Sequence, residues 1–402
     1  MKLPRIPLRL VDSFMHATSI DSSPLEPRSV WNTTVAGQAL QVFVELGPYI
    51  EAVLEDIRRA QQRIWIETYI LGNDRVGQAI TAALAKRAAE GLDVRLMVDA
   101  IGSLRASNKM LGEIVAAGGK VHSFHSFGWR LWDWLNLRRL NRRNHRKLLL
   151  IDEDIAYLGG MNFVDPREGM RDDAWRDVHV RVQGELAKDV AAAMERLWQR
   201  VHGEKVEWPP WPVQELQVDG PDTMLLFDSL PSVRMRRAAR VFVPLIRQAR
   251  KQITLSMAYF VPQGAILRAL LKARKRGVVI RVLVPGVSDV PIVQYATEYL
   301  YARLLKAGVK VYERRDLMLH SKTMVVDDRW SIVGSCNLDP LSLRRNLEVL
   351  AAIRSRSFAD ILKQIVAQEQ KQSRRITDEY LANRSWWRRM LCRLAWMVRD
   401  WL

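Results

Sequence analysis

The chain has 402 residues, of which 48% are hydrophobic and 26% charged. This balance excludes a disordered or fibrous protein and is sufficient for two domains. The formal net charge of +18 predicts an anionic partner, either nucleic acid or the anionic face of a membrane. Cys336 and Cys392 are the only cysteines, which excludes a disulfide framework and indicates a reducing compartment. We predict no signal peptide, and no apolar run reaches the ~18 residues typical of a spanning helix.

The first half of the chain starts without clear periodicity and then becomes regular. Residues 1–37 contain scattered Pro, Ser and Thr, and we expect them to be irregular. Residues 64–70 predict a strand, and 76–90 predict a helix that ends at Gly91. Residues 93–98 predict the next strand.

The second half repeats this order of elements. Residues 253–259 predict a strand, 265–276 a helix that ends at Gly277, and 279–284 another strand. The repeat is roughly 150–180 residues long, which is too long for a solenoid and typical of a duplicated domain. Alternation of strands and helices predicts an α/β fold with mostly parallel sheets and helices on both faces.

The repeat divides the chain into five predicted segments. These are an irregular extension (1–37), a first lobe (38–205), a Pro-rich linker (206–222), a second lobe (223–375) and an amphipathic Trp/Arg tail (376–402). We expect a pseudo-two-fold axis to relate the two lobes, with the active site at their interface.

Each half carries the same polar motif at the corresponding place. In both, Lys lies two residues after His, Asp seven after and Asn seventeen after. The first set is His145, Lys147, Asp152 and Asn162, and the second is His320, Lys322, Asp327 and Asn337. Because side chains alternate along a strand, His and Lys of one motif point into one site. Two full matches at equivalent positions of a repeat are not accidental.

Two carboxylates accompany the motifs. Glu348 lies 28 residues after His320, and Asp177 lies on the corresponding strand of the first half, displaced by four residues. We expect each carboxylate to bind the far nitrogen of a histidine, which fixes the tautomer and favours the cation. Ser335 adds a hydroxyl donor at a turn where the first half has Gly160.

These residue types suit reactions of phosphodiesters. An imidazole titrates near neutrality, so that one histidine can act as nucleophile while its partner carries a proton. The lysines and asparagines supply donors around a phosphoryl group. A two-step reaction through a phosphohistidine follows, and it requires no metal or other cofactor.

The paired motifs and their glycine-asparagine turns resemble the phospholipase D superfamily over about residues 40–370. Residues 289–293 and 337–343 resemble bacterial cardiolipin synthases of the shorter type without N-terminal transmembrane helices. The resemblance implies that His145 attacks phosphorus and that His320 protonates the leaving alcohol.

The resemblance also implies a reaction. A phosphatidyl group passes from phosphatidylglycerol to His145 with release of glycerol, and then to the hydroxyl of a second phospholipid. Asp152 and Asp327 belong to the catalytic motifs in a supporting role. A phospholipase D-type hydrolase and a nuclease acting on phosphodiesters would use the same histidines, and a basic membrane scaffold is a third reading. The sequence does not distinguish phosphatidylglycerol, phosphatidylethanolamine and a small alcohol as the acceptor.

Tryptophan and arginine gather in two segments of the chain, one before His145 and one in the tail. The predicted membrane-binding residues are Trp129, Trp132, Trp386, Trp387, Arg388, Arg389 and Trp401. In the tail, the tryptophans fall on one helical face and the arginines on the other, as in an interfacial anchor. The alternative is a helix that docks on the protein's own core. We expect an anionic phospholipid membrane as partner, no nucleic acid, and a peripheral location on the cytoplasmic face of the bacterial inner membrane.

Overall fold

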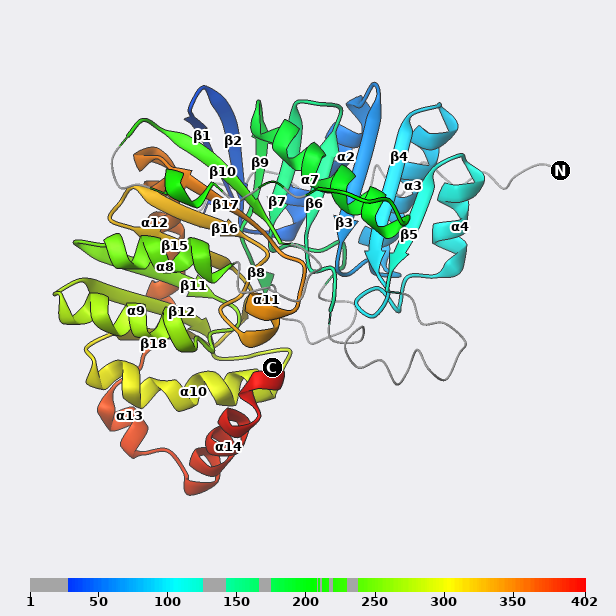
Figure 1. Ribbon diagram of the computed structural model, residues 1–402. Coiled ribbons are helices and arrows are strands. Elements are labelled where there is room, and N and C mark those ends of the chain that lie inside the picture. The colour runs from blue at the N-terminus through cyan, green and yellow to red at the C-terminus, as the bar shows by residue number, and fades with distance from the viewer. Residues whose placement is uncertain are drawn as a thin grey trace, which may run out of the picture.

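Two lobes, each built on an eight-stranded sheet, lie side by side in the computed structural model (Figure 1). The structure describes residues 28–125, 142–165, 175–207, 209, 212–216, 220–229 and 238–402. Trp129 and Trp132, two of the predicted membrane-binding residues, lie outside these ranges.

The first sheet has the strand order β1-β2-β9-β7-β6-β3-β4-β5. In chain order its strands are β1 (Val30–Val35), β2 (Gln38–Phe43), β3 (Arg63–Thr68), β4 (Asp93–Asp99), β5 (Lys120–Phe124), β6 (Leu148–Ile151), β7 (Ile155–Gly159) and β9 (His179–Gln183). The helices are α2 (Leu46–Arg59), α3 (Arg75–Ala89), α4 (Asn108–Ala116) and α7 (Leu186–Val201). Alternating side chains of β6 divide the faces: Leu149 packs in the cluster with α2 and α3, whereas Leu150 packs in the cluster with α7.

The second sheet has the strand order β10-β17-β16-β15-β11-β12-β13-β18. Its strands are β10 (Thr223–Asp228), β11 (Gln252–Met257), β12 (Val279–Pro285), β13 (Lys310–Arg314), β15 (Lys322–Val326), β16 (Trp330–Gly334), β17 (Val349–Arg354) and β18 (Ser373–Arg375). The helices are α8 (Ala239–Gln248), α9 (Gly264–Lys275), α10 (Pro291–Lys306), α11 (Pro340–Arg344) and α12 (Arg356–Lys371). Helices α8, α9 and α10 cover one face and α12 the other. The short helix η2 (Val213–Glu215) lies in the predicted linker.

The predicted class, a duplicated α/β fold, is confirmed, but the pairing within each sheet is mixed. Parallel pairing joins β3 to β4 to β5, and β11 to β12 to β13. The remaining neighbours are antiparallel, including β6 with β7 and β15 with β16. This corrects the expectation of mostly parallel sheets. Tight turns join β6 to β7 and β15 to β16, and a short turn forces antiparallel pairing, whereas parallel strands need a crossover helix.

Strand β1 corrects a second expectation, because it lies within the segment predicted to be irregular. It forms a hairpin with β2 around Ala36 and Gly37, both of which have positive φ (48° and 78°). Such a turn matches the twist of antiparallel strands. Only Trp31 and Val35 of the strand are buried. Two apolar positions do not produce a readable period of two.

One hydrophobic cluster continues from the first lobe into the second. It joins Val180 and Val182 of β9 to Val333 of β16 and Ala351 of β17. The four side chains are fully buried. The lobes therefore share a core, and their relative position is set by apolar packing as well as by the polar site.

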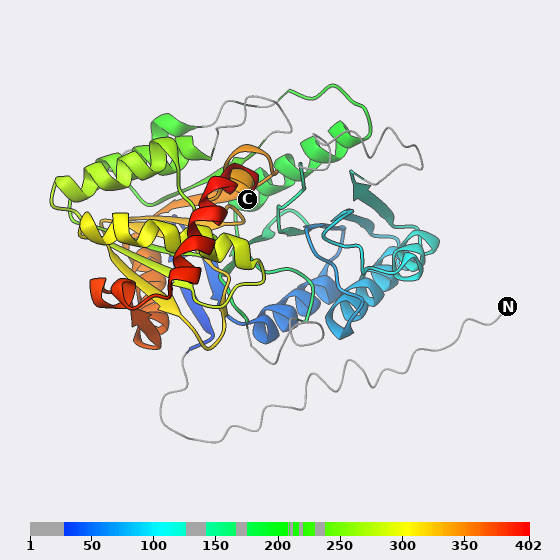
Figure 2. The ribbon, with the colours of Figure 1, turned by 90° about the horizontal axis from the view of Figure 1, so that it is seen from below.

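The C-terminal tail contains α13 (Asp378–Ala382), α14 (Trp386–Met397) and the 3-10 helix η3 (Arg399–Trp401). Helix α14 lies against α10 in both views (Figures 1 and 2). Cys392 and Ala395 are buried at this contact, and Trp396 stacks on Tyr299 with ring centroids 5.0 Å apart. None of the helices in the described part of the chain has the length and apolarity to cross a bilayer.

Candidate active site

Each histidine motif enters the site along a strand segment of the opposite lobe. The Asn144 bridge to Leu347 is parallel, and His145 N–H donates to Leu347 O at 2.9 Å. In the same way β14 (Met318–Leu319) pairs with β8 (Trp175–Arg176), and His320 N–H donates to Arg176 O at 2.6 Å. Because Glu348 follows Leu347 and Asp177 follows Arg176, each histidine lies beside the carboxylate of the other lobe.

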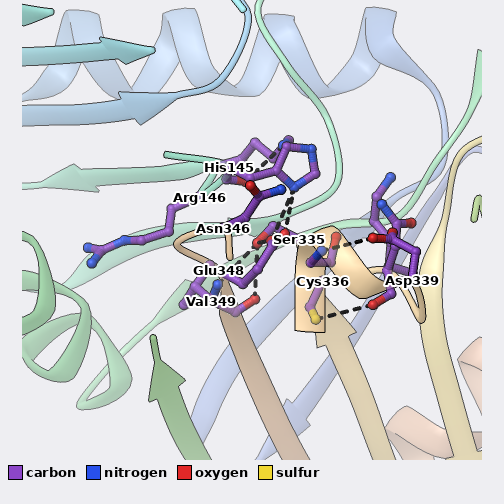
Figure 3. A network of polar contacts seen from close by, with 12 residues as sticks. His145, Arg146, Ser335, Cys336, Asp339, Asn346, Glu348 and Val349 are labelled. Atoms are coloured by element: carbon purple, nitrogen blue, oxygen red, sulfur yellow. Dashed lines mark hydrogen bonds and ion pairs between the residues drawn. The ribbon is translucent and has the colours of Figure 1, made fainter. Parts of the chain in front are cut away.

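The first half-site, which we define as His145, Lys147, Ser335 and Glu348, is a buried polar network. Figure 3 shows His145, Ser335 and Glu348. His145 Nδ1 lies 3.0 Å from Glu348 Oε1 and 3.1 Å from Oε2. The Ser335 hydroxyl donates to Glu348 Oε2, and Lys147 Nζ donates to His145 O at 2.8 Å. The ring of Tyr69 contacts that of His145 edge to face at 4.9 Å. The imidazole orientation is therefore held from both sides.

The second half-site, which we define as His320, Lys322, Asp177 and Gly160, repeats this arrangement with a shorter carboxylate. His320 Nδ1 lies 2.6 Å from Asp177 Oδ2, and Val178 N–H donates to Asp177 Oδ1 at 2.7 Å. Lys322 Nζ lies 2.8 Å from the same ring nitrogen and 3.6 Å from Asp177 Oδ2. The contact with Asp177 is the shortest of these, so the carboxylate holds the proton on Nδ1.

The glycine turns of the two half-sites differ because their carboxylates differ in position. A Cβ on Gly160 would lie 2.1 Å from Asp177 Oδ1. At the equivalent position, Ser335 has room for a side chain that donates to Glu348. The carboxylate of Asp177 thus occupies the space that a serine would need. This explains why the hydroxyl predicted at Ser335 has no counterpart in the first turn.

The motif asparagines hold the ends of the central strands. Asn162 Oδ1 accepts from Ile70 N–H at 3.2 Å, and Asn337 Oδ1 accepts from Tyr259 N–H at 3.4 Å. Asn162 also lines a small cavity together with His320, Trp175 and Asp177. The amide of Asn162 therefore serves the turn and faces the second half-site.

Asp152 and Asp327, which were predicted in a supporting role within the catalytic motifs, both bind backbone N–H groups. Asp152 accepts from the backbone N–H groups of residues 61–63 at 2.8–3.1 Å. Asp327 does the same with residues 250–252 at 2.6–2.9 Å. Seven residues of extended chain span roughly 23 Å. Each aspartate therefore lies at the far end of the strand from its histidine, where it closes a turn.

Burial and charge shift the proton affinities of the histidines downward. Burial lowers the pKa of His145 well below 6.5, and the charges of Lys147 and Lys322 lower it further. Burial and Lys322 also lower the pKa of His320, while the Asp177 carboxylate acts in the opposite direction. Burial likewise lowers the pKa of both lysines. Cations in a dry site repel one another, and an arriving phosphate would relieve this.

The two carboxylates respond differently to the same burial. Burial raises the pKa of Glu348 to about 8, although Lys147 and the Ser335 hydroxyl oppose the shift. Burial also acts to raise the pKa of Asp177, but Lys322 and His320 outweigh it, and the net shift is downward. The carboxylate beside His320 is therefore the more readily ionised of the two.

Two buried ion pairs at the site were missed in the sequence. Arg143 pairs with Asp99 at 2.7 Å, and Arg146 pairs with Glu67 at 2.9 Å. Arg146 points away from the histidine ring (Figure 3). Glu67 lies near the end of β3 and Asp99 ends β4. Acidic residues at the carboxyl ends of parallel strands were the available signal.

The predicted membrane-binding residues of the tail divide into two groups. Trp386, Trp387 and Trp401 are 62%, 56% and 67% exposed, and Arg389 is also exposed. Arg388 instead faces α10, where its guanidinium donates to both oxygens of the buried Glu298 at 2.9 and 2.6 Å. Arg388, which was predicted to bind the membrane, thus forms an ion pair within the protein. The tail docks on the protein, as in the second of the two predicted arrangements. It still presents an apolar face outward.

Comparison with known proteins agrees with the fold. The profile of a family described as "Cardiolipin synthase, PLD-like domain" matches residues 53–198 and 242–369. Cardiolipin synthase B of Escherichia coli (strain K12) is 34% identical over 366 residues, which cover 87% of this chain and 85% of the relative. A cardiolipin synthase of Listeria welshimeri is 30% identical over 351 residues, which cover 87% of this chain and 72% of the relative.

A solved structure with a similar fold is the phosphatidylserine synthase of Haemophilus influenzae Rd KW20. Its TM-score is 0.68 at 15% sequence identity, and the superposition covers 90% of this chain and 95% of that chain. At this identity the likeness concerns the fold alone.

Proposed function

The chain belongs to the cardiolipin synthase family with phospholipase D-like domains, and from this premise we propose that it transfers a phosphatidyl group from phosphatidylglycerol to the hydroxyl of a second phospholipid through a phosphohistidine on His145. The predicted family and the predicted enzyme class, a phosphatidyltransferase, are confirmed by the relatives. The donor, the acceptor and the roles of individual residues are part of the proposal.

In the first step, His145 Nε2 attacks phosphorus and the bond from phosphorus to the glycerol oxygen breaks. His320 gives its Nε2 proton to that oxygen, and glycerol leaves. In the second step, an acceptor hydroxyl gives its proton to His320 while its oxygen attacks phosphorus, and the bond to His145 breaks. The protein regains its starting protonation state, and the products are cardiolipin and glycerol.

The pairing of each histidine with a carboxylate of the other lobe supports His145 as the nucleophile and His320 as the acid. A proton held on Nδ1 by a carboxylate leaves Nε2 free to attack or ready to exchange a proton. Asp177, whose pKa is lowered, stabilises an imidazolium at His320. Glu348, whose pKa is raised, gives His145 less stabilisation as a cation. The difference favours His145 as the neutral nucleophile and His320 as the acid.

The lysines stabilise charge on the phosphoryl oxygens. Lys147 and Lys322 each donate to the backbone oxygen of their own histidine, so both ammonium groups are anchored at the site. Both are buried. A cation held in a low-dielectric site stabilises the transition state without reorganisation of water.

The proposal is tested with purified protein and vesicles that contain phosphatidylglycerol. We expect the protein to release one glycerol for each cardiolipin that it forms. His145→Ala and His320→Ala should form neither. The exposed His202 provides the matched control, because His202→Ala leaves the site intact. Phosphatidic acid as the main product would identify a hydrolase, and cleavage of DNA with no effect on vesicles would identify a nuclease.

We expect the protein to associate with a membrane, and we further propose that the outer face of the tail makes this contact on the cytoplasmic side. Seven of the twelve large hydrophobic side chains that are exposed in the described ranges lie between residues 386 and 401. They are Trp386, Trp387, Leu391, Leu394, Met397, Val398 and Trp401. An apolar patch with tryptophan suits the interface of a bilayer.

Vesicle sedimentation tests this contact. We expect the double variant Trp387→Ser, Leu394→Ser to bind anionic vesicles at least about 10-fold more weakly, because two exposed side chains that insert into the bilayer contribute roughly 3 kcal/mol to binding. Leu104 is 71% exposed on the first lobe. Leu104→Ser is therefore the control and should bind like the parent. Equal binding by the double variant would refute the contact.

A further inference from the structure

The phenol of Tyr259 links a carboxylate to the second half-site. Tyr259 follows β11, and its ring lies edge-on to His320 with centroids 6.4 Å apart. Its hydroxyl donates to Asp289 and lies 2.8 Å from both carboxylate oxygens. Asp289 belongs to the connection between β12 and α10. The carboxylate therefore lies one aromatic ring away from the imidazole that exchanges a proton with the alcohol.

Asp289 has acceptor capacity that the protein does not fill. Within the described ranges it contacts the Tyr259 hydroxyl and, at 3.5 Å, the Ser288 hydroxyl, and it forms no ion pair with a lysine or arginine. The residue is only partly buried. A carboxylate offers about four lone-pair positions, and the phenol has a single proton to donate. Donors from a bound molecule can therefore reach it.

The two lobes differ at this place. Ile70 and Tyr259 are equivalent, because the backbone N–H of each donates to the motif asparagine of its lobe. Ile70 has no polar side chain, and within the described ranges the phenol of Tyr69, whose ring lies beside His145, forms no hydrogen bond with a carboxylate. The pair is specific to the side of the site where, in the proposed reaction, the alcohol leaves and arrives.

A carboxylate close to a phosphoryl site is unfavourable for the phosphate and favourable for hydroxyl groups. Like charges repel, whereas a hydroxyl that donates to an ionised carboxylate forms a strong hydrogen bond. The glycerol that leaves in the first step carries two further hydroxyls, and the glycerol headgroup of an acceptor carries one besides the reacting hydroxyl. A binding group for these hydroxyls must lie beside His320.

We propose that Asp289, oriented by Tyr259, binds the free hydroxyls of the glycerol group and so selects a polyol as leaving group and acceptor. The inference rests on the proposed function. Asp289 acts on the choice of alcohol, and Tyr259 is a positioning residue. Neither takes part in breaking or forming the bond to phosphorus.

A competition between two three-carbon alcohols tests the subsite. Full-length protein is incubated with phosphatidylglycerol vesicles, deuterated glycerol and 1-propanol, and the ratio of deuterated phosphatidylglycerol to phosphatidylpropanol is measured. We expect a ratio above the ratio of alcohol concentrations for the parent protein and a decrease of about 10-fold for Asp289→Ala, as for loss of one charge-assisted hydrogen bond. The ratio does not depend on how much protein is active.

Two further variants make the result decisive. Tyr259→Phe keeps the ring and removes the hydroxyl, and it should lower the ratio by a smaller factor. Asp222 is an exposed carboxylate in another loop, and Asp222→Ala should keep the parent ratio. An unchanged ratio in both Asp289→Ala and Tyr259→Phe would overturn the subsite. So would a defect confined to phosphatidylethanolamine as acceptor, because it would indicate an ammonium site.

The failure of the proposed function has a different signature. In that case the parent protein forms neither alcohol product and gives only phosphatidic acid or only cleaved DNA. A parent protein that forms both products at a ratio insensitive to Asp289 overturns the subsite alone.

Discussion

The first half-site and the second half-site have the same backbone plan and different carboxylates. Glu348 takes a hydrogen bond from Ser335, whereas Asp177 fills the space above Gly160 and takes its bonds from the backbone and from His320. Burial raises the pKa of Glu348, and the pKa of Asp177 is lowered. Duplication thus supplies two similar positions, and the changes from Asp to Glu (one methylene) and from Gly to Ser (one hydroxymethyl group) accompany their different proton affinities. The two chemically distinct roles that we propose for His145 and His320 rest on that difference.

The largest effect should come from removing each imidazole and changing the leaving group. With phosphatidylglycerol, His145→Ala and His320→Ala should both lose activity by about 10³-fold or more. With a nitrophenyl phosphodiester, whose leaving group needs no proton, we expect His320→Ala to regain nitrophenolate release. His145→Ala should stay inactive because the nucleophile is missing. If His145→Ala releases nitrophenolate and His320→Ala does not, His320 is the nucleophile and His145 is the acid.

Exchanging the turn residues should have the next largest effect. Gly160→Ser places a Cβ against Asp177, which must move away from His320. We expect a decrease in kcat of about 10–100-fold, as for loss of an orienting carboxylate contact. Ser335→Gly removes one hydrogen bond without a clash and should cost less than about 10-fold. A larger loss from Ser335→Gly would show that the hydroxyl has a direct part in the reaction.

The motif aspartates should affect folding and not the reaction. Asp152→Ala and Asp327→Ala each leave backbone N–H groups without an acceptor. We expect a decrease in the free energy of unfolding of about 1–3 kcal/mol for each. Urea unfolding measures the loss, and kcat per folded molecule should be unchanged. A 100-fold lower kcat at full stability would return these residues to the catalytic set.

The pH dependence of stability should separate the carboxylates with opposite signs. The folded pKa of Glu348 is raised from 4.5 to about 8. The contribution of Glu348 to the free energy of unfolding is therefore fully present below pH 4.5 and is lost as the pH rises to about 8. Asp177 contributes above its ordinary pKa of 3.8, and the contribution is lost as the pH falls below that value.

Urea unfolding at pH 5 and pH 8 measures the effect of Glu348. The free energy of unfolding of the parent should decrease from pH 5 to pH 8, and Glu348→Gln should not show this decrease. Asp177→Asn should keep that decrease and differ from the parent below pH 4. Identical pH profiles for the parent and Glu348→Gln would contradict the raised pKa.

The sequence was sufficient for the duplicated architecture and for the candidate residues of both half-sites. The spacing of His, Lys, Asp and Asn is a local property of a strand and the turn that follows it, so it can be read from residue offsets. Asp177 could be found despite its displacement by four residues, because the segment between β8 and β9 that carries it has the same place in the order of the repeat. The tail was also recognisable as an amphipathic helix.

What depends on contacts between distant segments was decided by the tertiary structure. The crossed pairing of His145 with Glu348 and of His320 with Asp177 follows from two short strand contacts between lobes. The inward direction of Arg388 follows from the buried Glu298 on α10. A residue offset gives the periodicity of one segment, but the partner of a side chain depends on which segments pack together. Packing is a property of the whole chain, since apolar burial and ion pairing act between residues hundreds of positions apart.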